Sequence, residues 1–360
     1  MKILYAIQGT GNGHLSRARD IIPVLQKYHE VDILISGSQA DVELPFPVKY
    51  KFKGLGFIFG AKGGVDISET YKQNNVKALF LEIMSLPVSN YDLVLNDFEP
   101  VSAWACKLRK VRCISLSHQS AVLNSNFVQP KNADILGRMI LKNYAPANAK
   151  YGFHFKTVGE NIFTPVIRSQ VREQKVQNLG HYTVYLPAYD DQRIINTLGK
   201  CTDTRWEVFS KHNKKVIREN NYIIRPINNE AFIESMASAE GVLCGAGFET
   251  PAEALYMKKK LMVIPMQGQY EQQCNATALK EMGVPVLKNL KRKQIGKLNH
   301  WIETGVRIEV DYPDYTEEIV SKILKEQLPA YNFAPLQTES KLDSFKKFIN
   351  MLFRKMATQI

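Results

Sequence analysis

The chain alternates between short apolar runs and stretches in which apolar residues recur at helical spacing. Lys2 to Ile7 is the first apolar run, and Leu15, Ala18, Ile21, Ile22 and Leu25 then mark one face of a helix. The same alternation continues through the runs Val31 to Ile35, Tyr91 to Leu95 and Arg112 to Leu116. Strands that alternate with helices favour a parallel sheet covered on both faces.

A second series of this kind begins after a break near Gly159 and Pro165. Its expected strands are Tyr182 to Leu186, Trp206 to Phe209, Tyr222 to Ile224 and Gly241 to Cys244. We therefore predict an α/β protein with two Rossmann-like, doubly wound domains that face each other across a cleft. The predicted units are 1–157, 158–330 and a terminal helix within 331–360.

Polar side chains follow three strands of the first series. His14 follows a glycine-rich loop after the first strand, Asp97 ends a buried strand, and His118 follows the next one. Because the carboxyl ends of parallel strands share one edge of a sheet, Asp97 is placed to orient His14 as a general base. His118 is a candidate for contact with an acceptor. The alternatives are that His14 only caps its helix or meets solvent, and that Asp97 caps the following helix.

The second series contains a small-residue turn, Gly245, Ala246 and Gly247, between a strand and a helix. Such a turn leaves backbone N–H groups and a helix dipole available to an anion, and a diphosphate fits there. Glu253 follows one turn later and is placed to accept hydrogen bonds from ribose hydroxyls. Its alternative is a capping box with Thr250.

The next predicted helix begins with a dense polar set that suits a site for sugar hydroxyls. The set consists of Gln269, Glu271, Gln272, Gln273 and Asn275. Together with the small-residue turn, it predicts a nucleotide-sugar pocket at the carboxyl ends of the second series of strands.

Two segments allow a structural or a membrane interpretation. Residues 48–64 alternate basic and aromatic residues and then carry apolar side chains among glycines, which suits a strand and hairpin or a flap that touches lipid. The stripe Leu342, Phe345, Phe348, Ile349, Leu352, Phe353 and Met356 suits a helix packed on the first domain. With its neighbouring lysines it equally suits a helix on an anionic membrane.

Composition narrows the classes of function. The 360 residues carry a formal net charge of +12, which favours an acidic partner such as a phosphorylated substrate or an anionic membrane. No nucleic-acid recognition motif accompanies that charge, so nucleic acid is not expected as a partner. Apart from Asp97 and Glu99, no acidic cluster has metal-ligand spacing, and neither a metal nor another cofactor is expected. The five cysteines lack metal spacing, and no secretory or membrane-spanning segment is apparent. We expect a cytoplasmic protein, with peripheral membrane contact as an open alternative.

The motifs resemble those of GT-B glycosyltransferases, in the branch that includes plant-type UDP-glycosyltransferases and the peptidoglycan N-acetylglucosaminyltransferase. The resemblance rests on the loop Gly9-x-Gly11-x-Gly13-His14 and on the block from Gly245 to Ala276. It implies that His14 is the catalytic base, supported by Asp97. It also implies a donor site whose residues are Gly11, Gly13, Ile227, Gly245, Ala246, Gly247, Glu253, Gln272, Gln273 and Asn275.

The implied reaction is an inverting transfer of a sugar from a nucleotide sugar, with UDP as the expected nucleotide, to a hydroxyl acceptor. A lipid-linked or envelope glycan acceptor follows from the resemblance alone. Two other functions stay open: a nucleotide-sugar 2-epimerase, which needs no acceptor, and a nucleotide-sugar binding protein without catalysis.

Overall fold

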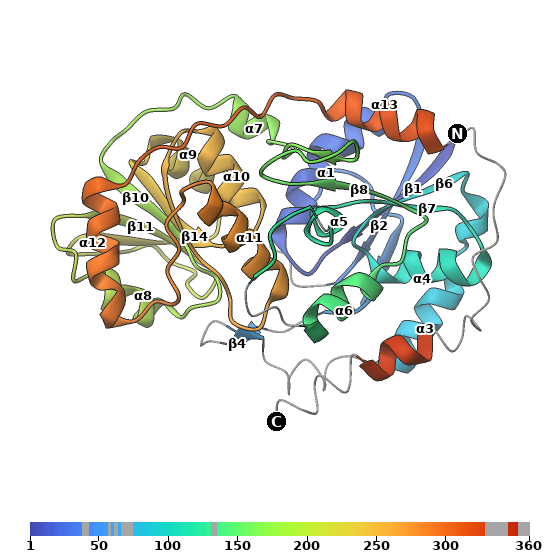
Figure 1. Cartoon of the computed structure of the whole chain (residues 1–360), viewed down its shortest axis with the longest axis horizontal. Helices are drawn as coiled ribbons and strands as arrows, with labels where there is room; N and C mark the ends of the chain where they lie inside the picture. Colours follow the sequence, from blue (N-terminus) through green and yellow to red (C-terminus); the bar gives the residue numbers. More distant parts are fainter. Residues whose placement is uncertain are drawn as a thin grey trace.

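The computed structural model describes residues 1–37, 43–56, 59–60, 64–65, 75–124, 126–130, 135–327 and 345–351. Within this part of the chain, two sheets with helices on their faces lie side by side (Figure 1). The predicted α/β class and doubly wound pattern are confirmed.

The first sheet has the strand order β3-β2-β1-β6-β7-β8-β9, and its paired strands are all parallel. Its strands are β1 (Lys2–Gln8), β2 (Glu30–Ser36), β3 (Tyr50–Phe52), β6 (Leu93–Asp97), β7 (Cys113–Leu116), β8 (Ala149–Phe153) and β9 (Ile162–Phe163). Successive residues of β1 enter different cores: Ile3, Tyr5 and Ile7 join one cluster, whereas Leu4 and Ala6 join another. Burial on both faces explains why β1 reads as a continuous apolar run.

The helices around this sheet are α1 (Asn12–Gln26), α3 (Val76–Ser85), α4 (Pro100–Arg109), α5 (His118–Val122) and α6 (Ile135–Tyr144), with the 3-10 turn η1 (Val88–Asn90) before β6. A short antiparallel pair, β4 (Phe59–Gly60) and β5 (Gly64–Val65), follows β3. Leu55, for which the sequence left a core position and an exposed flap open, is buried in the core with α3 and α4. The predicted flap residues 57–58 and 61–63 lie outside the described residues.

The second sheet has the order β12-β13-β11-β10-β14-β15, with β12 antiparallel to β13. Its strands are β10 (His181–Tyr185), β11 (Arg205–Ser210), β12 (Ile217–Glu219), β13 (Tyr222–Pro226), β14 (Gly241–Gly245) and β15 (Lys260–Ile264). The accompanying helices are α8 (Asp191–Leu198), α9 (Asn229–Ser238), α10 (Glu249–Tyr256), α11 (Tyr270–Glu281) and α12 (Ile295–Thr304), which follows the turn η2 (Arg292–Gln294).

Segments beyond the expected boundary at residue 157 return to the first sheet. β9 pairs with β8 at its edge, and α7 (Ser169–Arg172) then leads toward the second sheet. α13 (Thr316–Gln327) packs on α1, at the opposite end of the molecule from α12 (Figure 1). The first unit is therefore assembled from both ends of the chain.

The described part of the terminal helix, 345–351, also packs on the first unit. Phe345 and Phe348 contact Trp104 of α4, with ring centroids 5.1 and 5.4 Å apart, and Ile349 is buried with them. The apolar face of these residues therefore covers α4. Leu342, Leu352, Phe353 and Met356 of the predicted stripe lie outside the described residues.

Candidate active site

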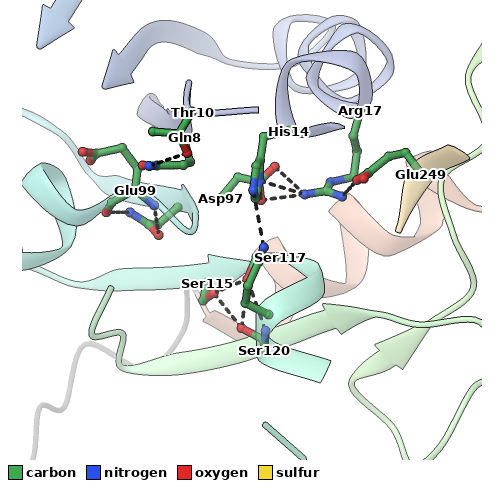
Figure 2. Close-up of polar contacts among 12 residues, drawn as sticks. Gln8, Thr10, His14, Arg17, Asp97, Glu99, Ser115, Ser117, Ser120 and Glu249 are labelled. Carbon is green, nitrogen blue, oxygen red and sulfur yellow. Dashed lines mark hydrogen bonds and ion pairs between the residues drawn. The ribbon is translucent and has the colours of Figure 1, made fainter. Parts of the chain in front are cut away.

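His14 and Asp97 come together at the carboxyl edge of the first sheet, because β1 and β6 are parallel neighbours. The His14 Nδ1 atom lies 2.8 Å from Asp97 Oδ1 (Figure 2). Neither alternative from the sequence is observed. No side chain caps α1, and α4 is capped by Glu99, which accepts hydrogen bonds from the N–H groups of Val101 and Ser102.

Asp97 is fully buried and is held by a second partner, Arg17, one turn after His14 on α1. Arg17 Nη2 lies 2.7 Å from both Asp97 oxygens. Burial alone raises the pKa of this carboxyl, but the positive charge of Arg17 and the contact with His14 outweigh it and lower the pKa below its ordinary value. Asp97 is thus ionised and accepts a hydrogen bond from His14 Nδ1–H, which leaves the lone pair on Nε2.

The Nε2 lone pair of His14 faces the amide of Gln119 of α5. Gln119 Nε2 lies 3.4 Å from His14 Nε2 and donates a 3.0 Å hydrogen bond to Glu271 Oε2 of α11. Gln119 Oε1 is buried and has no partner among the described residues. Burial opposes protonation of His14, but Asp97 and its hydrogen bond outweigh this and raise the pKa of His14 above its ordinary value. His14 therefore has the tautomer and the basicity that a general base requires.

Phe98 shapes the wall beside His14. Its backbone has φ of 58°, a region that a bulky residue rarely adopts. The ring lies within 9° of parallel to the imidazole, with centroids 6.5 Å apart, and stacks on Tyr144. Such strain is found most often at functional sites.

Glu249 connects this edge to the second sheet. It lies in the first turn of α10, two residues after Gly247, and forms an ion pair with Arg17 Nη1 (Figure 2). A Cβ atom at Gly13 would collide with the Glu249 carboxylate. The starts of α1 and α10 are therefore in contact.

The predicted diphosphate turn follows β14. Ala246 is buried, while Gly245 and Gly247 are half-buried. A Cβ atom at Gly247 would meet no atom within 4 Å, and no side chain caps α10. The start of α10 at this turn is a suitable position for an anion.

Glu253 lies behind this turn in a buried ion pair. Its carboxylate accepts hydrogen bonds from Arg168 Nε at 2.5 Å and Nη2 at 2.8 Å. Helix α10 begins at Glu249, so Thr250 is inside the helix and the capping box considered from the sequence is not formed. Only 2% of Glu253 is exposed.

The predicted donor residues at the start of α11 differ in exposure: Gln272 and Asn275 are buried, whereas Gln273 is half-buried. Gln272 Oε1 accepts a 3.0 Å hydrogen bond from the Met266 N–H, and Gln273 is half-buried. Asn275 is fully buried and donates to the Ala246 carbonyl over 3.1 Å. Among the predicted donor residues, Gln273 thus has the most accessible side chain on this helix.

His118 joins α5 to α11 in the interior. Its Nδ1 lies 2.8 Å from the Phe153 carbonyl and its Nε2 lies 2.6 Å from Asn275 Oδ1. Its ring stacks on Phe248 and is 1% exposed. The geometry does not support the predicted acceptor contact, because both ring nitrogens are occupied inside the protein.

The remaining predicted donor residues belong to two other segments, one in each half of the molecule. Gly11 and Gly13 belong to the start of α1, and Ile227 directly follows β13 on the second sheet. The Ile227 N–H donates to the Ser210 carbonyl, and its side chain is half-buried. Gly13 lies beside Glu249, whereas no described contact joins Ile227 to the other predicted residues.

Sequence comparison identifies the family. The family model described as Glycosyl transferase family 1 matches residues 1–303. The chain belongs to this family. No curated protein matches the sequence. Because the chain belongs to the glycosyltransferase family, it is an enzyme of sugar transfer. The two alternatives from the sequence, epimerisation and binding without catalysis, are not favoured.

Solved structures confirm that the glycosyltransferase has the GT-B fold. MurG of Acinetobacter baumannii is 14% identical with a TM-score of 0.54, and the match covers 91% of this chain and 99% of that chain. UGT89C1 of Arabidopsis thaliana, crystallised with UDP, is 12% identical with a TM-score of 0.50, and the match covers 98% of this chain and 99% of that chain.

The described part of this glycosyltransferase contains no cluster of three or more His, Cys, Asp or Glu side chains that could hold a metal ion. The five cysteines are buried free thiols. None of the described helices combines the length and apolar character needed to cross a membrane.

Four residues contact the predicted ones but were given no role from the sequence: Arg17, Gln119, Arg168 and Glu249. Arg17 follows His14 by three positions, so helical spacing alone would have placed it on the same face. Glu249 is an acidic residue at a predicted anion site, a conflict that pointed to a nearby cation. Arg168 lies in an irregular segment and left no such signal.

Proposed function

We propose that the protein is an inverting glycosyltransferase that moves a sugar from a UDP-sugar to an acceptor hydroxyl. The observation that carries this proposal is the His14–Asp97 pair, in which Nδ1 is engaged at 2.8 Å and Nε2 keeps its lone pair. His14 removes the acceptor proton as the hydroxyl oxygen attacks the anomeric carbon. The carbon–oxygen bond to the diphosphate breaks on the opposite side, which inverts the configuration.

The turn Gly245–Gly247 and the start of α10 stabilise the charge of the departing UDP in this proposal. Gln272 and Gln273 provide polar groups around the donor sugar in this proposal, and the buried Asn275 orders the start of α11. Glu253 is assigned to the ribose and Ile227 to the base by the family resemblance alone. The crystal structure of UGT89C1 with UDP supports the choice of nucleotide by similarity of fold alone.

Gln119 has the position that suits an acceptor contact. Its amide lies beside His14 Nε2, and its carboxamide oxygen is buried with no partner among the described residues. An acceptor hydroxyl that displaces the direct contact between Gln119 and His14 would donate to His14 Nε2 and accept from the Gln119 amide. Gln119 therefore replaces His118 in the proposal.

The decisive test is His14→Ala in an assay of UDP release from a panel of UDP-hexoses, with n-octyl β-glucoside as the acceptor probe. Loss of a general base is expected to lower the rate about 10²- to 10⁴-fold. UDP affinity, measured by calorimetry, should stay unchanged. His300→Ala, at an exposed position on α12, is the matched control. An unchanged rate in His14→Ala would contradict the assignment of the base.

The proposal extends to a lipid-linked acceptor and contact with an anionic membrane. The support is a set of exposed apolar side chains, Leu81 and Met84 on α3 and Met139 on α6, with Arg138 and Lys142 beside the latter. Co-sedimentation with vesicles of phosphatidylserine and phosphatidylcholine should be weakened by Leu81→Ser together with Met84→Ser. Equal sedimentation of both proteins, or none, would remove α3 from the proposal.

A further inference from the structure

A buried guanidinium joins the proposed base to the helix that begins at the donor turn. Arg17 is 1% exposed, lies bidentate on Asp97 and forms an ion pair with Glu249. His14 shares the same Asp97 oxygen. These four residues thus form a continuous chain of polar contacts, in the order His14, Asp97, Arg17 and Glu249. Arg17 and Glu249 are 232 positions apart in the sequence.

The two carboxylates belong to different halves of the molecule. Asp97 ends β6 of the first sheet, whereas Glu249 lies in the first turn of α10, behind β14 of the second. A buried cation that loses one of its anionic partners is strongly destabilised. The contact between Arg17 and Glu249 therefore favours the arrangement in which the donor turn lies against α1.

We propose that Arg17 and Glu249 are positioning residues. Through them, the strength of His14 as a base depends on whether the start of α10, in the donor-binding half, lies against α1. The proposal rests on the proposed function, because it assigns His14 the role of base. It adds a link by which correct placement of the donor turn prepares the base on the other side of the cleft.

The link acts through charge and geometry together. With Glu249 in place, Arg17 divides its attraction between two carboxylates, and Asp97 keeps enough negative charge to hold His14. If the halves move apart, Arg17 acts on Asp97 alone and His14 loses a negative neighbour. His14 is then a weaker base.

The groups that face His14 come from five elements. Asp97 belongs to β6, Arg17 to α1, Gln119 to α5 and Glu249 to α10, while Glu271 of α11 acts through Gln119. Burial makes the largest contribution and lowers the pKa of His14, and Arg17 lowers it further. Asp97 and Glu249 raise this pKa. Only Glu249 and Glu271 in this group belong to the second half.

Gly13 gives the link a steric requirement. Because a Cβ atom at this position would collide with the Glu249 carboxylate, Gly13→Ala should displace that flexible side chain from Arg17 while the formal charges stay the same. This variant separates the effect of geometry from that of charge.

The first experiment measures the pKa of His14 by NMR titration of histidine-labelled protein without substrate. The His14 signal is identified by its loss in His14→Ala. Glu249→Gln is expected to lower the pKa of His14, because a negative neighbour disappears, and Gly13→Ala should act in the same direction. Glu240→Gln, which loses ion pairs to Lys260 and Arg307 in the second half, is the control and should cause no change.

The second experiment follows UDP release against pH. In Glu249→Gln, the rise of kcat/KM with pH should begin at lower pH, in step with the NMR result. The maximal kcat should fall about twofold to thirtyfold, as expected for loss of about 0.5–2 kcal/mol of coupling. KM for the UDP-sugar should change less than kcat, since the link acts on the base.

Two outcomes would overturn the proposal. One is an unchanged pKa of His14 in Glu249→Gln. The other is a tighter UDP-sugar KM with unchanged kcat, which would mean that Glu249 only repels the donor. Failure of the proposed function is distinguishable, because His14→Ala would then keep its rate while the NMR titration, which requires no transfer, still reports the link.

Discussion

At the scale of single residues, the site depends on buried charges that are paired across long sequence separations. Glu253 is the clearest case, since its partner Arg168 lies 85 positions earlier and also donates to Asn229. The sequence indicated the acidic residue and its helix, but nothing in the pattern indicated the cation. Both oxygens of this carboxylate accept hydrogen bonds from Arg168, and only 2% of Glu253 is exposed, so the geometry does not show a contact with ribose.

This pairing changes how the ribose assignment must be tested. Glu253→Ala alone should cost about 3–5 kcal/mol of folding free energy, because it leaves the Arg168 charge buried and unpaired. Glu253→Met combined with Arg168→Met should recover most of that loss, since apolar residues of similar volume replace the pair. Urea unfolding measures both.

Nucleotide affinity then separates the two roles of Glu253. If it binds ribose, the stable double variant should still bind UDP about tenfold more weakly by calorimetry, as expected for one lost hydrogen bond to a charged group. Wild-type affinity in that variant would show that Glu253 has a structural role alone.

At the scale of elements, periodicity and strand ends were enough to predict which side chains would share an edge. The apolar runs correctly predicted β1, β6 and β7, and the parallel arrangement brought His14 to within hydrogen-bond distance of Asp97. Packing between elements could not be predicted in the same way. His118 follows the same rule as His14, yet it is buried because α11 and Phe248 cover it.

The helix starts show why this difference arises. Strand and helix patterns depend on neighbours within a few residues, which the sequence displays directly. The contact between α1 and α10 depends on Gly13 leaving space for a carboxylate from the other half. In the sequence, Gly13 was assigned to a glycine-rich loop and to the donor site. Its contact with Glu249 was not predicted, because that contact joins distant segments.

At the scale of the whole molecule, the two halves are not independent bodies in sequence. α13 and the helical segment 345–351 follow the second sheet in the chain but pack on the first unit. The Arg17–Glu249 and His118–Asn275 contacts join the two halves through largely buried side chains. We therefore expect the described units to unfold together in one cooperative transition.

Ligand binding tests this cooperativity and the donor site at once. UDP at 100 times its Kd should stabilise the folded protein by about 2.7 kcal/mol and raise the Tm of the single transition. Uridine, which lacks the diphosphate, should raise it less if the turn from Gly245 to Gly247 binds the anion. Differential scanning calorimetry measures both. Two separate transitions, of which UDP raises the Tm of only one, would show that the contacts between the halves are too weak to couple their unfolding. That result would also count against a link through Arg17.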